Sequence, residues 1–197
     1  MGKRVVQPPP SKGGRGARQR ILDAAAELFY REGINATGVE RLATESSVSK
    51  RTLYQHFPSK AAVVEAYLHS IEQRIANPAQ PGMHAANETP RERLLAVFNP
   101  PVAGVTPLRG CPFHNAAVEA AGAMPGVQEI VRANKRTFIE GLTALAEQAG
   151  AVDPRQLGSQ LALLYEGAAA LATSLDDSSP WTQARTAAET LIEQTLT

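Results

Sequence analysis

Signals for the start of an α-helix recur along this chain, and they constrain its fold more than any other feature. Thr37 precedes Glu40 by three residues, and the same pattern returns in residues 89–92 (Thr-Pro-Arg-Glu) and 153–156 (Asp-Pro-Arg-Gln). In such a capping box the first side chain accepts a free backbone N–H, and the last one returns to the N–H of the first residue. Ser49 and Ser59 offer the simpler N-cap. A chain with these signals is predicted to consist of helices.

The residues between these signals agree with that prediction. Apolar side chains recur three and four residues apart, as they do on one face of a helix. The chain holds 33 alanines and only 5% aromatic residues, a composition that favours helix over strand. We therefore predict an all-α protein with about nine helices and no strand.

The order of the elements predicts two domains. Residues 1–14 are rich in Pro and Gly, lack apolar periodicity and are expected to be a disordered basic arm. Within residues 15–60, one helix from Arg18 to a C-terminal Gly33 is followed by two short helices about four residues apart, which matches a helix-turn-helix. Residues 61–197 would form a larger helical domain. Its first helix would end near Asn77, and a Pro- and Gly-rich loop over residues 77–87 would separate that helix from the others.

Charge is distributed unevenly between these domains. The whole chain has a net charge of only +1, but residues 1–60 carry eleven Lys or Arg against five acids, a net of +6. The remaining residues carry nine against fourteen, a net of −5. A basic end on an acidic body is typical of a nucleic-acid-binding module joined to a regulatory domain. The alternative is an uneven scatter of surface charge.

The N-terminal segment resembles the TetR/AcrR family of transcriptional repressors. The resemblance covers roughly residues 18–68 and rests on residues 20–25 (Arg-Ile-Leu-Asp-Ala-Ala), on Leu28, Phe29, Gly33 and Thr37, and on residues 48–60 (Val-Ser-Lys-Arg-Thr-Leu-Tyr-Gln-His-Phe-Pro-Ser-Lys). Two departures are visible: the family commonly has a small residue at the position of Arg51, and usually Ala-Gly where this chain has Ser46-Ser47.

The third helix of this segment is the expected recognition helix. It begins with a hydroxyl and two cations, and Arg51 or Lys50 can donate to guanine O6 and N7 in the major groove. The resemblance implies phosphate contacts from Tyr54, His56 and Lys60, and Thr37 at the start of the preceding helix suggests another. The alternative is that Tyr54 packs in the core and the cations are merely solvated. The full predicted DNA-contacting set is Thr37, Ser49, Lys50, Arg51, Thr52, Tyr54, Gln55, His56 and Lys60.

The resemblance also implies a homodimer whose last two helices form a four-helix bundle with those of a second copy. Small side chains there would let backbones approach, and larger ones would supply apolar area. The residues expected at this interface are Leu161, Ala168, Ala172, Ala184, Ala188, Leu191 and Ile192. The alternative is that the alanines pack only inside one protomer. A two-fold dimer would bind a pseudo-palindromic operator in double-stranded DNA.

An effector of unknown identity would bind among the helices of the second domain. The candidate ligand-binding residues are Phe98, Cys111, Phe113, His114, Phe138 and Tyr165, with an ordinary hydrophobic core as the alternative for each aromatic residue. Because few charges cluster in these helices, an apolar or amphipathic small molecule is favoured as the effector.

Cys111 is the single cysteine, so the chain contains no intramolecular disulfide. Its C-x-x-H spacing with His114 suggests zinc, but no second pair stands at the required distance, and we predict no metal site. A thiol at a helix start can be activated by the helix dipole. We expect an inert buried thiol, because only Arg109 is a cation close in sequence. A redox- or electrophile-sensing regulator acting through Cys111 is the alternative function.

Other classes of protein are disfavoured by what the sequence lacks. Residues 47–50 match the S-x-x-K of penicillin-recognising hydrolases without its companion motifs, and no nucleotide-binding fingerprint occurs. We predict no enzyme and no cofactor. The longest stretch without a charged residue is interrupted by prolines and is too short to span a bilayer, and no secretory signal is apparent, so a cytoplasmic protein without a membrane partner is expected.

Overall fold

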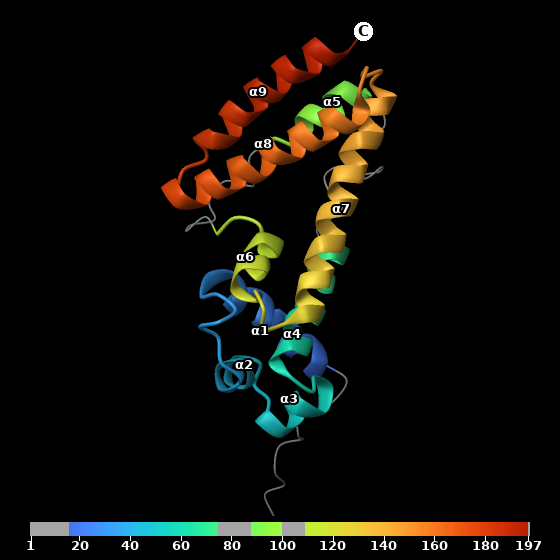
Figure 1. Cartoon of the computed structure of the whole chain (residues 1–197). Coiled ribbons are helices and arrows are strands. Elements are labelled where there is room, and N and C mark those ends of the chain that lie inside the picture. The colour runs from blue at the N-terminus through green and yellow to red at the C-terminus, as the bar shows by residue number, and fades with distance from the viewer. Residues whose placement is uncertain (1–15, 75–87, 100–108, 197) are drawn as a thin grey trace, which may run out of the picture. The chain divides into compact units, whose positions relative to one another are not determined.

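The computed structural model describes residues 16–74, 88–99 and 109–196. The predicted basic arm and the predicted loop over residues 77–87 lie outside this range. The described residues form nine α-helices and no strand, with one isolated bridge between Ala151 and Leu196 (Figure 1). The all-α prediction is confirmed.

The helices divide between two compact units, Met1–Tyr67 and Leu68–Thr197. The division falls inside α4 (Lys60–Arg74), seven residues beyond the expected boundary after residue 60. The first unit also contains α1 (Ala17–Arg31), α2 (Val39–Glu45) and α3 (Lys50–His56). The second contains α5 (Pro90–Ala96), α6 (Pro112–Glu119), α7 (Pro125–Gln148), α8 (Pro154–Leu175) and α9 (Ser179–Thr195).

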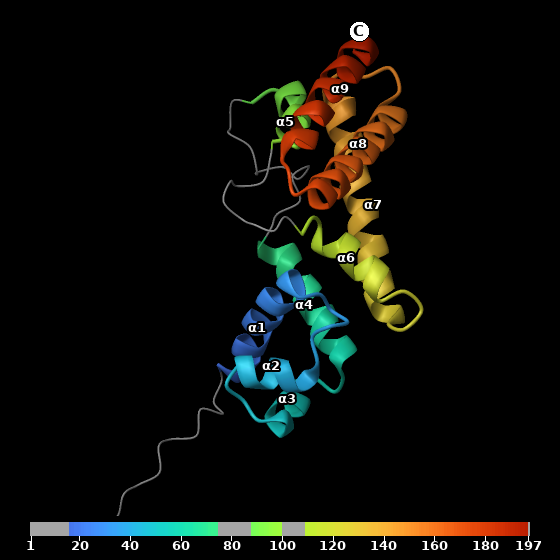
Figure 2. The same ribbon diagram turned by 90° about the vertical axis from the view of Figure 1, so that its left-hand side faces the viewer.

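The first unit is built around the apolar face of α1. Ile21, Ala25 and Leu28 of this face are buried, and the Phe29 ring meets the Tyr67 ring of α4 edge to face at 5.4 Å. Gly33 has a φ of 99°, the left-handed conformation predicted for the end of this helix. The helices α1, α2 and α3 thus pack against one another (Figure 2).

The predicted capping box of α2 is wrong. The residue at the N-cap is Gly38, and no side chain caps the helix. The Thr37 hydroxyl instead donates to the Gly33 carbonyl at 2.7 Å, so it belongs to the end of the preceding segment. Thr37 is fully buried there, because this bond turns its side chain into the core.

The turn between α2 and α3 uses two serines where the related family usually has Ala-Gly. Ser46 is buried and donates its hydroxyl to the Leu42 carbonyl at 2.6 Å, while its own carbonyl accepts from Arg20 Nε at 3.0 Å. Ser47 adopts a φ of 51°, a left-handed conformation that glycine tolerates better than serine. The turn therefore keeps the helix-turn-helix geometry at some cost in backbone strain.

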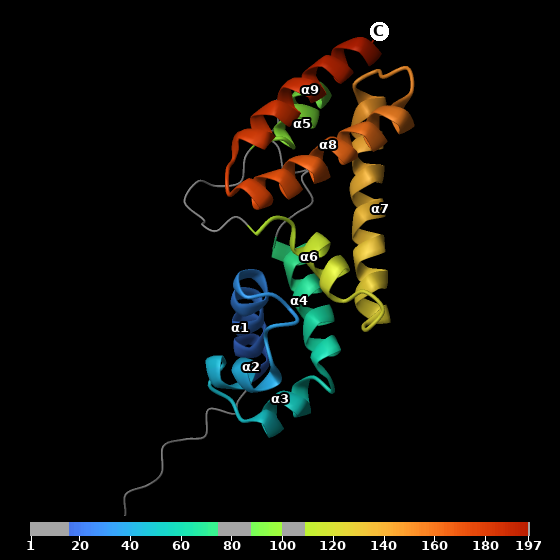
Figure 3. The same cartoon turned by 60° about the vertical axis from the view of Figure 1, so that its left-hand side comes forward.

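In the second unit, α8 packs between α7 and α9 (Figure 3). The short helix α5 lies against α7 and α9, and α6 lies against α7. The shared core holds residues from α5 and the last three helices, including Leu94, Phe98, Leu142, Leu157, Leu161, Ala168, Ala172, Ala184, Ala188 and Ile192. Most of these lie on the apolar stripes expected from the sequence.

Two helix starts in this unit follow the predicted caps. Thr89 Oγ1 accepts from the Glu92 N–H at 3.2 Å, and the Glu92 carboxylate accepts from the Thr89 N–H at 2.7 Å, a complete capping box. The Thr89 N–H and the Thr89 hydroxyl both donate to the Glu92 carboxylate, and these bonds hold the pKa of Glu92 below its usual value. Asp153 caps α8 by accepting from the Gln156 N–H at 2.9 Å.

The backbones of α7 and α8 approach each other closely at Gly158. A Cβ atom built at this glycine would lie 2.8 Å from the Thr143 backbone nitrogen and 3.0 Å from its Cα. Both atoms belong to the helix backbone, which cannot give way easily. Glycine is required here because the two helices cross without room for a side chain.

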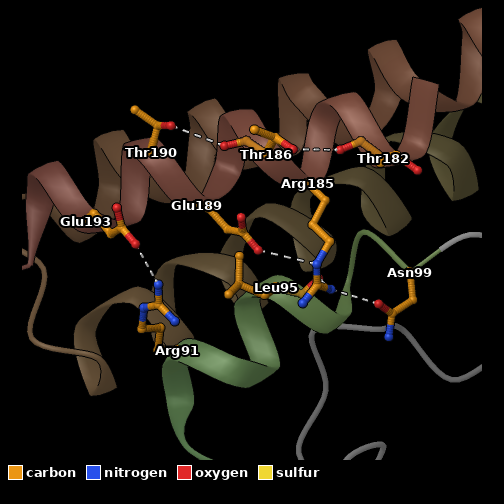
Figure 4. A network of polar contacts seen from close by, with 9 residues as sticks. All are labelled: Arg91, Leu95, Asn99, Thr182, Arg185, Thr186, Glu189, Thr190 and Glu193. Atoms are coloured by element: carbon orange, nitrogen blue, oxygen red, sulfur yellow. Dashed lines mark hydrogen bonds and ion pairs between the residues drawn. The ribbon is translucent and has the colours of Figure 1, made fainter. Parts of the chain in front are cut away.

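Charged groups tie α9 to α5 (Figure 4). The Arg91 guanidinium pairs with Glu193 at 3.0 Å, and Arg185 donates to the Leu95 carbonyl at 3.0 Å and to Asn99 Oδ1 at 2.8 Å. On α9 itself, Thr186 and Thr190 donate to carbonyls one turn earlier. The charges of α9 thus turn toward α5.

Candidate nucleic-acid interface and ligand cavity

The inner face of α3 fixes how this helix sits on the first unit. Leu53 and Phe57 are buried, and the Arg18 guanidinium lies over the Phe57 ring at 5.3 Å from its centre. Ser49 caps the helix as predicted, accepting from the Thr52 N–H at 3.0 Å, and the Ser49 and Thr52 hydroxyls lie 2.9 Å apart. These contacts leave the opposite face of α3 to solvent.

The outer face of α3 carries most of the predicted DNA-contacting side chains. Arg51, Tyr54, Gln55 and His56 are exposed, and 47% of the Tyr54 surface is accessible. The alternative that Tyr54 packs in the core does not hold. A short helix with a cation, a phenol, an amide and an imidazole on its free face can donate to base edges and to phosphate oxygens.

Lys50, at the start of α3, forms an ion pair with Glu40 of α2. This pair raises the pKa of Lys50 and lowers that of Glu40, chiefly through their mutual hydrogen bond. Both side chains remain exposed. Lys50 therefore has a competing partner in the free protein. Among the residues that the structure describes, no carboxylate forms an ion pair with Arg51.

The two remaining predicted positions differ in outcome. Lys60, at the start of α4, is partly exposed and its ammonium lies 3.5 Å from the Asn35 carbonyl. Thr37 cannot serve as a phosphate clamp, because the residue is fully buried and its hydroxyl is used within the unit. The sequence predicted that Thr37 caps α2 because Glu40 follows it at the spacing of a capping box.

The second unit contains a cavity of about 170 Å³. It lies between the start of α6 and the C-terminal half of α8 and is lined by Gly110, Cys111, His114, Asn115, Glu166, Ala169, Ala170, Thr173 and Ser174. Two of these, Cys111 and His114, were predicted as ligand-binding residues. The hydroxyls, the amide and the carboxylate make the lining more polar than the sequence suggested.

The four predicted aromatic ligand residues lie elsewhere. Phe113 is buried, and Tyr165 stands at the centre of an aromatic cluster with ring-centre distances of 6.5 Å to Phe98, 4.8 Å to Phe138 and 5.0 Å to Trp181. Burial raises the pKa of the Tyr165 phenol far above its usual value, so the phenol is neutral. These contacts match the alternative of an ordinary core for the aromatic set.

Sequence reasoning missed two residues near Cys111: Lys135, which contacts its sulfur, and Glu166, which pairs with Lys135. Lys135 of α7 places its ammonium 3.5 Å from the Cys111 sulfur and 2.5 Å from Glu166 Oε1 of α8. Cys111, Lys135 and Glu166 are each partly exposed. No local pattern links residues 111, 135 and 166, since only the packing of three helices brings them together.

The predicted dimer interface needs correction. Leu161, Ala168, Ala172, Ala184, Ala188 and Ile192 are buried inside the single chain, and only Leu191 is partly exposed. The apolar side chains that α8 leaves to solvent are Leu163, Leu171 and Leu175, which are 73%, 54% and 62% exposed. The buried residues therefore pack inside the protomer, which matches the alternative stated for the alanines, and α8 carries apolar residues on both faces.

Nowhere in residues 16–74, 88–99 and 109–196 do three or more His, Cys, Asp or Glu side chains gather closely enough to hold a metal ion. Among the same residues, no helix combines the length and apolar character needed to cross a bilayer.

The fold and the exposed face of α3 define a helix-turn-helix protein with a separate helical unit. The family profile "Bacterial regulatory proteins, tetR family" matches residues 21–67, and the profile "Tetracyclin repressor-like, C-terminal domain" matches residues 90–188. The chain belongs to the TetR family of transcriptional regulators.

Similar proteins agree with this membership. The uncharacterised HTH-type transcriptional regulator Rv1255c of Mycobacterium tuberculosis is 30% identical over 128 residues, which span 64% of this chain and 63% of that relative. The HTH-type transcriptional repressor KstR2 of Rhodococcus jostii is 39% identical over 69 residues, 34% of each chain. The crystal structure of SCO4454, a TetR-family regulator from Streptomyces coelicolor, is 28% identical with a TM-score of 0.80, and the match covers 93% of this chain and 97% of that one.

Proposed function

We propose that the chain is a homodimeric, ligand-responsive transcriptional repressor that binds a pseudo-palindromic operator and is released by a small-molecule effector. The observation that carries the DNA-binding part is the free face of α3, where Arg51, Tyr54, Gln55 and His56 are all exposed. No catalytic role is proposed for any residue, and the cytoplasm is the compartment that such a function requires.

The exposed residues of α3 divide into two roles. Arg51 lies in the first turn, the part of a recognition helix that meets base edges, and its guanidinium can bind guanine through two hydrogen bonds. Tyr54, His56 and Lys60 donate to phosphates, which position the protein without reading sequence. Lys50, Ser49, Thr52 and Gln55 complete the proposed set. Lys50 must exchange Glu40 for DNA, which reduces its net gain on binding.

The exposed face of α8 supports the homodimer. Leu163 and Leu171 lie two turns apart on this face, with Gly167 between them. A Cβ atom at Gly167 would meet nothing within 4 Å. A glycine in the middle of an exposed helix is unfavourable in one protomer, but it allows the backbone of a second helix to approach closely. Exposed leucines beside such a glycine fit a helix of a second copy.

The free face of α9 fits the same role. The charged side chains of α9 turn toward α5 or pair with each other; they are Arg185, Glu189 and Glu193 (Figure 4). The helix also exposes a set of uncharged side chains: Thr182, Gln183, Thr186 and Thr190. Uncharged side chains can be buried between two protomers without the desolvation penalty of an ion. We propose that α8 and α9 of two copies form the bundle, with Leu163, Leu171 and the threonines replacing the buried alanines of the earlier prediction.

The cavity between α6 and α8 is the proposed effector site. Its volume of about 170 Å³ is below the range of roughly 300–1,000 Å³ that is common for drug-sized ligands. The polar lining and this volume point to a small ligand with hydrogen-bonding groups, rather than the apolar effector that the composition suggested. Release would follow if the ligand binds more tightly to a conformation that holds the two recognition helices at the wrong spacing.

The test uses the DNA that flanks the gene of this chain. Fluorescence anisotropy with fragments of this DNA should give salt-dependent binding to one pseudo-palindromic site, and footprinting should protect two half-sites about one helical turn apart. Arg51→Ala should weaken binding to that site and relax the preference at one base pair in each half-site. Arg132→Ala, which changes an exposed arginine of α7, is the matched control and should bind as the unmodified protein does. Equal affinity for all fragments would contradict the proposal.

The direction of regulation is tested separately. A reporter gene placed under the protected site should be expressed at a low level when the regulator is present and at a high level when it is absent. The opposite order would make the chain an activator and leave the DNA-binding part of the proposal intact.

A further inference from the structure

Two adjacent cations at the start of α3 differ in their partners. The Lys50 ammonium pairs with the Glu40 carboxylate of α2, across the turn that joins the two helices. Arg51, the next residue, is exposed, and none of the described carboxylates forms an ion pair with it. The first turn of the proposed recognition helix therefore offers DNA one available cation and one that already has an anionic partner.

We propose that Glu40 is an intramolecular competitor for DNA: its carboxylate binds Lys50 in place of a backbone phosphate and so lowers the affinity for DNA of every sequence. The effect rests on the proposed function, because Lys50 matters only where α3 contacts DNA. Glu40 is then a positioning residue of α2, which acts through Lys50 and need not touch the DNA itself.

The backbone holds the two side chains of this pair within reach of each other. Leu42 of α2 and Leu53 of α3 are fully buried, so both helices are anchored in the core of the first unit. Within the turn, the Val48 N–H donates to the Ala43 carbonyl at 3.0 Å. Most exposed ion pairs contribute little, because two long side chains must be ordered to form them. Here the two helices already stand in the arrangement that the pair requires.

The pair can also be broken by DNA without any change of fold. The side chains of Lys50 and Glu40 are 52% and 75% exposed, so a phosphate can approach the ammonium from solvent. Carboxylate and phosphate oxygens both accept charge-assisted hydrogen bonds from an ammonium. The hydrogen bond between the two residues raises the pKa of Lys50 and lowers that of Glu40, so both are charged at neutral pH. Glu40 is therefore a reversible competitor and not a permanent block.

The exchange changes the number of ions that are released when DNA binds. A cation that neutralises a phosphate releases a counterion from the DNA, and each such contact steepens the dependence of log K on log salt concentration by about 0.9. When Lys50 leaves Glu40 for a phosphate, the freed carboxylate attracts a cation in return. The net release from this contact is therefore small with Glu40 in place and close to one ion when an uncharged residue replaces it.

Glu40→Gln removes the charge and keeps the size of the side chain. Fluorescence anisotropy over a range of salt concentrations measures binding to a duplex of scrambled sequence and to the footprinted operator. The variant should bind both duplexes roughly two- to fivefold more tightly at low salt, with a salt slope steeper by up to about 0.9. Glu45→Gln is the matched control, because it removes a carboxylate of the same helix that pairs with Arg41 instead. This control should bind about as the unmodified chain does.

Lys50→Met shows whether the effect passes through Lys50. With Glu40 present, this change should weaken binding only slightly, because the cation already has a partner. In the Glu40→Gln background it should weaken binding several-fold, and Glu40→Gln should bring no gain to a chain that lacks Lys50. The proposal is overturned if Glu40→Gln leaves the affinity unchanged. It is equally overturned if the gain is the same with and without Lys50, since the carboxylate would then act by repelling DNA directly.

A titration without DNA tests the ion pair itself. NMR of the side-chain carboxyl carbon should show a pKa of Glu40 below its usual value in the unmodified chain and a higher pKa in Lys50→Met. Circular dichroism should show that this variant is folded. The same pKa in both chains would show that the pair does not form in solution and would contradict the proposal.

The two duplexes distinguish this inference from the proposed function. A chain that prefers the operator, but whose affinity does not respond to Glu40→Gln, would support the proposed regulator and contradict the role of Glu40. A chain that binds all sequences equally, and binds them more tightly in Glu40→Gln only when Lys50 is present, would do the reverse.

Discussion

The helices α3 and α8 leave very different faces to solvent, although both are anchored by a buried leucine. Beyond Leu53, α3 exposes a guanidinium, a phenol, an amide and an imidazole. Beyond Leu161, α8 exposes Leu163 and Leu171 with a glycine between them. The first face suits phosphates and base edges, and the second suits an apolar helix. The chemistry of the exposed face therefore indicates the partner, and the buried face indicates only the fold.

The sharpest test of this comparison replaces two nearby leucines of α8, one buried and one exposed, with alanine. Leu161→Ala should lower the free energy of unfolding by about 2–5 kcal/mol, because it opens a cavity in the core. Leu163→Ala should leave the protomer itself as stable, because that side chain is 73% exposed. Urea titrations followed by the fluorescence of Trp181, the single tryptophan, report on this unit.

The proposed dimer provides the second half of this test. Leu163→Ala should weaken self-association in analytical ultracentrifugation, and its apparent stability should depend more on protein concentration than that of the unmodified chain. Unchanged self-association in Leu163→Ala and in Leu171→Ala would show that this face of α8 has another role.

Two glycines of α8 make the same distinction through the backbone. Gly158→Ala should destabilise the second unit by about 1–3 kcal/mol, because the new methyl group would overlap the backbone of Thr143. In a protomer, Gly167→Ala should raise stability by up to about 1 kcal/mol, since alanine favours the helix and meets nothing. Thermal denaturation of the two variants at low protein concentration checks both signs. A stabilising effect of Gly158→Ala would contradict the close crossing of α7 and α8.

On the DNA-binding side, the comparison predicts unequal effects within one helix. Arg51→Ala should weaken operator binding by about 1–3 kcal/mol and relax the preference at one base pair in each half-site. Tyr54→Phe and Lys60→Ala should weaken binding to all sequences alike, because phosphates carry no sequence information. Anisotropy against the operator and single-base variants measures both. The division of roles fails if all three changes reduce the preference equally.

Local patterns explain why so much of the fold could be predicted from the sequence. Ser49, Thr89 and Asp153 cap helices where expected, and Gly33 ends a helix in the left-handed conformation, because these features depend on neighbours within four residues. The error at Thr37 has the same origin. Its spacing to Glu40 matched a capping box, but the nearby Gly33 carbonyl was the better partner for the hydroxyl.

Contacts between distant residues explain the rest. Periodicity showed that α8 has apolar residues, but it could not tell which of two apolar faces lies inward. The approach of Lys135 to Cys111 arises from the packing of α7 against the start of α6, across 24 residues of sequence. The sequence argument for an inert thiol considered only cations that are close in the chain, and the structure supplies one from a separate helix.

The smallest expected effect concerns two left-handed residues, one in each unit. Ser47 in the turn before α3 has a φ of 51°, and Asp176 at the end of α8 has a φ of 48°. For residues other than glycine this conformation costs roughly 1–2 kcal/mol, with Asp and Asn tolerating it better than most. Glycine removes this cost but adds about 0.4–1 kcal/mol of backbone entropy to the unfolded chain.

Ser47→Gly should therefore stabilise the first unit by about 0.5 kcal/mol, and Asp176→Gly should change the second unit by less or destabilise it. Trp181 does not report on the first unit, so hydrogen exchange of amides in α1 and α3 is the measurement for Ser47→Gly, with Trp181 fluorescence for Asp176→Gly. Because Ser47 is exposed and lies before α3, its replacement should leave the DNA preference unchanged. A loss of operator binding in Ser47→Gly would show that the serine hydroxyl itself contacts DNA, and the turn would then be part of the interface rather than only its support.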